Sequence, residues 1–134
     1  MVITNCIIAG NSVGGVGFWC QGEVRNCTFA GNRVSALWRE CSSGVDEVEV
    51  TNCIFLDGGI GGFGRVPRAT LSYSNVRGGG VHEGRYLDFP GEGNVDADPC
   101  FADPGYWDPN GTPDDANDDF WVDGDYHLKS QGGR

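Results

Sequence analysis

The residues of this chain best suited to chemistry are the oxygen donors of an Asp-rich stretch between residues 108 and 119. Calcium takes about six to eight oxygen ligands, and a divalent ion relieves the repulsion between closely spaced carboxylates. The stretch lacks the glutamate that closes an EF-hand loop. The alternative is a solvated acidic loop in which Asp and Asn serve as turn residues. The calcium site predicted here consists of Asp108, Asn110, Asp114, Asp115, Asp118 and Asp119.

Three arginines form a second candidate site. Arg39, Arg65 and Arg68 can line one face of the molecule and bind a ligand, or they can be ordinary surface charges at variable positions. The four tryptophans can likewise stack against sugar rings or pack inside the fold. No group of residues predicts a catalytic centre by its own pattern.

The elements that must position these residues belong to an internal repeat. Thr4-Asn5-Cys6-Ile7 returns as Arg25-Asn26-Cys27-Thr28, as Thr51-Asn52-Cys53-Ile54 and, more weakly, as Ser74-Asn75-Val76-Arg77. A repeat slightly longer than 20 residues is typical of solenoids. Short alternating runs such as residues 45–50 predict strands, and no stretch shows an apolar stripe at helical spacing.

A strand-only repeat of this length without a leucine-rich pattern predicts a parallel β-helix of about four coils. Coils stacked about 4.8 Å apart place like residues above like. Four columns are therefore predicted. They are the turn ladder Asn5, Asn26, Asn52 and Asn75, whose amides bond from coil to coil; the inward cysteines Cys6, Cys27 and Cys53; the apolar set Ile8, Phe29 and Phe55; and a second apolar set Val13, Val34 and Ile60.

Composition limits the partners. The formal net charge is −10, and residues 96–134 hold 10 Asp against one Lys and one Arg. Nucleic acids and anionic membranes need a basic face, so neither is expected as a partner. The chain has no long apolar run, so membrane insertion is not expected either. A length of 134 residues predicts one domain at most.

The Asn-Cys repeats, followed by Tyr73-Ser74-Asn75-Val76 and by Gly93-Asn94-Val95-Asp96-Ala97-Asp98-Pro99-Cys100-Phe101, resemble secreted bacterial right-handed parallel β-helix proteins of the pectate-lyase-like and polymorphic-outer-membrane-protein-like type. The resemblance implies coils over residues 1–77 and an acidic segment over 78–134 that caps the last coil. It also implies an extracellular or cell-surface location. The chain would be a fragment with a structural or adhesive role, binding polysaccharide or a surface protein. The alternatives are the distal part of a calcium-dependent polysaccharide lyase or glycoside hydrolase, and a self-assembling solenoid unit whose open coil ends stack head to tail.

Two further expectations concern cysteines and self-association. Six Cys in an extracellular chain allow disulfides, whereas repeat-equivalent positions favour free, buried thiols that pack as small apolar groups. The first strand, Met1-Val2-Ile3-Thr4, is apolar and uncharged. An open strand edge of this kind is a template for another chain, which predicts self-association through the N-terminal coil.

Overall fold

The computed structural model describes residues 1–18, 21–39, 48–56, 60–61, 69–77, 80–82, 85–87 and 91–129; residues 39, 60–61, 80–82 and 85–87 are described by their backbone alone. All regular structure within these ranges is β-strand, which confirms the predicted all-β class. Arg65 and Arg68 lie outside the described residues, and Arg39 is placed only as the last residue of a strand.

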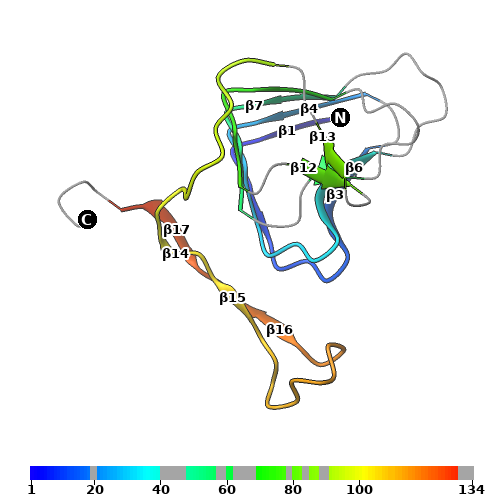
Figure 1. Cartoon of the computed structure of the whole chain (residues 1–134), viewed down its shortest axis with the longest axis vertical. Coiled ribbons are helices and arrows are strands. Elements are labelled where there is room, and N and C mark those ends of the chain that lie inside the picture. Colours follow the sequence, from blue (N-terminus) through cyan, green and yellow to red (C-terminus); the bar gives the residue numbers. More distant parts are fainter. Residues whose placement is uncertain are drawn as a thin grey trace.

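Three sheets of parallel strands make up the N-terminal part, and the chain visits them in turn (Figure 1). The first sheet contains β1 (Val2–Thr4), β4 (Gly22–Arg25), β7 (Val48–Thr51) and β10 (Ala69–Ser72). The second contains β2 (Ile7–Ala9), β5 (Thr28–Ala30), β8 (Ile54–Phe55) and β11 (Asn75–Val76). The third contains β3 (Gly14–Phe18), β6 (Ser35–Arg39) and β9 (Ile60–Gly61). Each of the first three repeats thus supplies one strand to every sheet.

Stacked apolar columns fill the space between the sheets. In the second sheet Ile8 pairs with Phe29, Phe29 with Phe55, and Phe55 with Val76, as predicted for the first three of these residues. The rings of Phe29 and Phe55 are stacked, with centroids 4.7 Å apart and planes 6° apart. In the first sheet a column of Ile3, Val24, Val50 and Leu71 runs beside them. Equivalent apolar side chains of successive repeats are therefore stacked on one another, and they make up most of the buried core.

The turn between the first and second sheets has one backbone conformation in every repeat. Asn5, Asn26 and Asn52 all adopt left-handed φ values of 53° to 56°. Asparagine is one of the few residues that tolerates this region, because its short side chain can hydrogen-bond locally. The fourth repeat places Tyr73, with φ 53°, at the same point. The strand register agrees, since Ser72 pairs with Thr51.

Two predicted column members are therefore misplaced. Asn75 pairs with Ile54, two residues beyond the ladder position that was predicted for it. Ile60 pairs with Leu37, although it was predicted to stand above Val34. The Ile60 error arises because the turn before the third sheet is shorter in the third repeat, whereas the Asn75 error arises because Tyr73 and Ser74 replace Asn-Cys in a turn of unchanged length.

The C-terminal part continues from the last repeat into an antiparallel ribbon. Residues 91–97 lie along the fourth repeat, where Tyr73 N donates to Glu92 O at 2.8 Å and Val95 N donates to Ser74 O at 2.9 Å. The ribbon pairs β14 (Phe101–Asp103) with β17 (Asp125–Leu128), then β15 (Tyr106–Asp108) with β16 (Phe120–Val122) (Figure 1). A short hairpin, β12 (Gly80–His82) and β13 (Arg85–Leu87), completes the strands.

Candidate functional site

The tip of the ribbon lies against the turn that follows the second sheet. At Gly10 and Gly31, which have φ values of +66° and +60°, the ring of Trp121 occupies the space where a side chain would begin. An added Cβ would meet ring atoms at 2.3 Å on Gly10 and at 2.1 Å on Gly31. Glycine is therefore required at both positions for two reasons, the left-handed backbone and the close approach of the indole.

A small apolar cluster extends this contact along the second sheet. Ala30, Leu56 and Phe101 are buried together, and Tyr126 packs against them. The rings of Phe101 and Tyr126 meet edge to face, with centroids 5.5 Å apart. Burial is the largest influence on the Tyr126 hydroxyl and raises its pKa. The ribbon thus covers the outward side of the sheet whose inward side carries the phenylalanine column.

Arg33 holds the acidic loop at the tip of the ribbon. Its guanidinium carbon lies 4.1 Å from the centre of the Trp107 ring. Its Nη1 donates to Ala116 O at 2.9 Å, and its Nη2 forms an ion pair with Asp119. Trp107 in turn donates from Nε1 to Gly31 O at 2.8 Å. One arginine therefore combines an aromatic, a backbone and a carboxylate contact, which its planar fork of donors permits.

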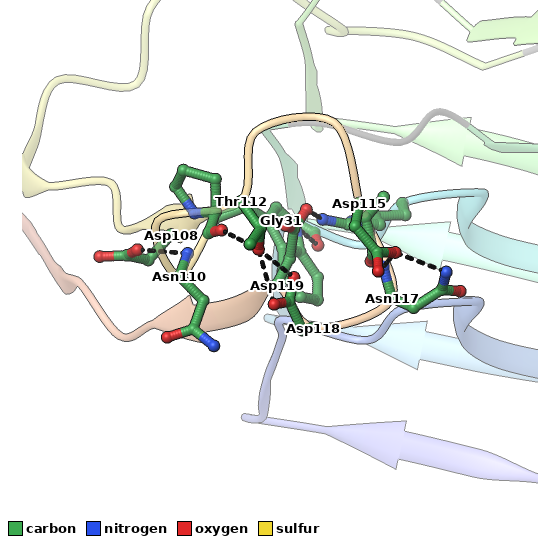
Figure 2. Close-up of polar contacts among 12 residues, drawn as sticks. Gly31, Asp108, Asn110, Thr112, Asp115, Asn117, Asp118 and Asp119 are labelled. Carbon is green, nitrogen blue, oxygen red and sulfur yellow. Dashed lines mark hydrogen bonds and ion pairs between the residues drawn. The ribbon is translucent and has the colours of Figure 1, made fainter.

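Several other polar residues of the loop have local partners, as Figure 2 shows. Thr112 donates from Oγ1 to the carboxylate of Asp118 at 2.6 and 2.8 Å. Asp115 accepts from the backbone N of Asn117 at 3.1 Å and from its side-chain amide at 2.6 Å. These two bonds, the backbone one first, lower the pKa of Asp115. The carboxylates thus shape the loop itself.

The calcium prediction is not met by a ready-made cluster. Within the described residues, which include all of 91–129, no three His, Cys, Asp or Glu side chains are grouped as a metal site. Asp119 is paired with Arg33, while Asp118 and Asp115 accept from Thr112 and Asn117. Calcium binding by Asp108, Asn110, Asp114, Asp115, Asp118 and Asp119 stays a prediction.

A recurring Asp-Pro turn builds the ribbon, and the sequence reasoning missed it. Asp98, Asp103 and Asp108 each precede a proline, five residues apart. Each accepts from the backbone N two residues on, at 2.8, 2.9 and 2.8 Å. The third residue is left-handed in every case, with φ values of 57°, 72° and 50°. These are Asx turns. The five-residue spacing of Asp-Pro was the signal that could have revealed them.

The cysteine column is present, and its thiols are free. Cys27 and Cys53 are buried, whereas Cys6 at the first repeat is exposed. Each donates from Sγ to the carbonyl two residues earlier, at 3.1 Å for Cys6, 3.2 Å for Cys27 and 3.3 Å for Cys53. Burial raises the pKa of Cys27, and it raises the pKa of Cys53 to about 11. High thiol pKa values make these groups poor nucleophiles and metal ligands at neutral pH.

The asparagine ladder is only partly bonded. Asn26 donates from Nδ2 to Asn5 Oδ1 at 3.1 Å, on the exposed flank of the turn. A second pair is tighter and lies deeper: Asn11 Nδ2 donates to Asn32 Oδ1 at 2.7 Å, and Asn32 Nδ2 donates to Ile8 O at 2.9 Å. Asn32 is 1% exposed, so this pair satisfies buried polar groups.

Comparisons with protein-family models, curated proteins and solved structures found no match for the chain. The resemblance to secreted β-helix proteins accordingly stays an expectation from the residues. Among the described residues no helix is long and apolar enough to cross a membrane.

Proposed function

We propose that the chain is a non-catalytic segment of a right-handed parallel β-helix, and that its role is structural or adhesive. The observation that carries this proposal is the set of three parallel sheets in matched register, to which successive repeats each add one strand. Parallel crossover connections are right-handed in nearly all proteins, which supports the handedness. A stack of this kind is a stiff support for groups on its flank.

The contacts of the acidic loop also favour a structural role. Asp119 is neutralised by Arg33, and Asp115 and Asp118 accept hydrogen bonds from Asn117 and Thr112, so these three carboxylates already stabilise the fold of the loop. Placement outside the cell, and polysaccharide or a surface protein as the partner, rest on the resemblance of the Asn-Cys repeats to secreted proteins.

The competing proposal is a polysaccharide lyase, and a direct assay separates the two. The protein is incubated with polygalacturonate or alginate, with and without millimolar calcium, and unsaturated products are followed by their ultraviolet absorbance. We expect no product above a boiled-protein blank. Product formation that is lost in Arg65→Gln or Arg68→Gln would replace the structural proposal with the lyase.

A further inference from the structure

The face of the ribbon that points away from the sheets carries an aromatic pair. Tyr106 pairs with Val122, and Asp108 pairs with Phe120, so these four side chains share one face. Trp107 and Trp121 form the pair on the opposite face, with ring centroids 5.6 Å apart, and they contact the repeats. Tyr106 is 54% exposed and Phe120 is 49% exposed. As diagonal neighbours they lie within reach of one contacting group, about 7–8 Å apart.

The strands that carry Tyr106 and Phe120 are anchored through their opposite face. Trp121 fills the space beside Gly10 and Gly31, and Trp107 donates to Gly31 O. The two strands therefore have little freedom to lose when a partner binds, and binding to a preorganised surface costs less free energy. Tyr106 and Phe120 are thus two solvent-exposed rings on a rigid strand pair, which is a surface suited to binding a partner.

The charge around the pair selects the partner. Residues 91–129 contain ten Asp and one Glu against Lys129. The Asp108 carboxylate, which lies on the same face as the pair, points away from the sheets in Figure 2. The bond from Asn110 N uses one lone pair of its Oδ1, so the group can accept further bonds. The carboxylates would repel an anionic partner. A cationic group would be attracted both by the carboxylates and by the faces of the two rings.

The molecule already contains one example of this recognition. On the opposite face of the ribbon Arg33 stacks over Trp107 and pairs with Asp119, which is a guanidinium held by an aromatic ring and a carboxylate together. Tyr106, Phe120 and Asp108 offer the same combination to solvent. We propose that this outer face binds a basic segment of a partner protein, with Arg or Lys side chains over the two rings. The proposal rests on the adhesive role above and names its partner class.

The test uses a fluorescent nona-arginine peptide and measures its affinity by anisotropy at physiological ionic strength. Because residues 91–129 hold ten Asp and one Glu against one Lys, some attraction is expected from charge alone, so the informative variant leaves the charge unchanged. The double variant Tyr106→Ala, Phe120→Ala should bind about tenfold more weakly, the loss of two cation–π contacts. The matched control Tyr73→Ala removes a tyrosine that is 56% exposed on the fourth repeat, and it should bind like the parent.

Equal affinity of the parent and the double variant would overturn the proposal, because binding would then be charge attraction alone. Binding of a neutral cello-oligosaccharide in place of the peptide would also overturn it and make the pair a sugar platform. Unchanged tryptophan emission in the double variant verifies that the ribbon remains docked. The lyase assay addresses the adhesive role separately, so the two failures can be told apart.

Discussion

Trp121 stands where a side chain at position 31 would have to begin, since its Cζ3 atom is 2.1 Å from the Cβ position of that residue. The relationship joins two parts of the chain that are 90 residues apart in sequence and makes the acidic ribbon part of one packed structure. It also explains why Gly10 and Gly31, at equivalent points of two repeats, are both glycine.

Replacing Gly31 by Ala should release the ribbon. The left-handed backbone costs roughly 1–2 kcal/mol for any L side chain, and the indole must also move. We expect a red shift of tryptophan emission and faster proteolysis within residues 109–119, with the β-sheet circular dichroism retained. The control is Gly111→Ala, which has φ +78° but nothing within 4 Å of the new Cβ. If both variants behave alike, backbone strain and not the Trp121 contact is the cause.

The conformation of the Asn turns can be separated from their hydrogen bonds. Asn26→Ala should lower the free energy of unfolding by about 1–2 kcal/mol, because alanine disfavours φ 53°. Asn26→Gly accepts this φ and should recover most of the loss, although it also lacks the bond to Asn5. Urea unfolding measures both. Equal losses in the two variants would mean that the amide bond, and not the backbone, is what matters.

Stability should fall at alkaline pH because of the buried thiols. Burial raises the pKa of Cys53 to about 11 from 9.0. Below pH 9 the thiol is protonated in both the folded and the unfolded state, so its contribution is fully present. Above pH 9 the unfolded state loses its proton first, so stability falls as pH rises from about 9 to 11.

Thermal unfolding across this pH range measures the effect, and Cys53→Ser should reduce it. Ser74 occupies the equivalent place in the next repeat and donates to Ser72 O at 3.0 Å, so serine is compatible with the position. An equally steep pH dependence in Cys53→Ser would assign the effect to other groups.

Calcium binding by the acidic loop is tested by the melting temperature in chelator and in millimolar calcium. A bound ion stabilises the folded state by mass action, so the predicted result is a rise with calcium concentration. In the described structure Asp115, Asp118 and Asp119 each bond to a different partner, so a shared ion would compete with those bonds. The same melting temperature in both conditions removes the calcium site.

Much of the fold follows from local pattern. In each of the first three repeats an Asn-Cys pair marks the turn, and an apolar residue follows two positions after the Cys. Because side chains alternate between the two faces of a strand, this spacing fixes which residues of the second sheet face the core. The fourth repeat was misaligned because Tyr73 and Ser74 stand where the other repeats have Asn-Cys. Asn75 was matched to the ladder asparagines in their place. The left-handed backbone at Tyr73 and the pairing of Ser72 with Thr51 identify the true equivalent.

The contacts between the ribbon and the repeats were harder to predict from the sequence. Nothing in the local pattern connects Trp121 to Gly10 and Gly31, or Arg33 to Trp107 and Asp119, because these contacts depend on where the ribbon folds back. Asp-rich segments are also ambiguous on their own, since carboxylates serve metal binding and Asx turns equally well. The five-residue Asp-Pro spacing favours turns, and it is the part of this site that sequence alone could have supplied.

The central claim is the parallel stacking of successive repeats in the register described. The most direct measurement is a methyl–aromatic nuclear Overhauser experiment on specifically labelled protein. The account predicts cross-peaks from the Val76 methyl groups to the Phe55 ring, and from the Leu71 methyl groups to those of Val50. The contradicting result is a Val76 methyl group that contacts Cys53 and not Phe55, as it would if Asn75 stood above Asn52, or the absence of any contact between the two repeats.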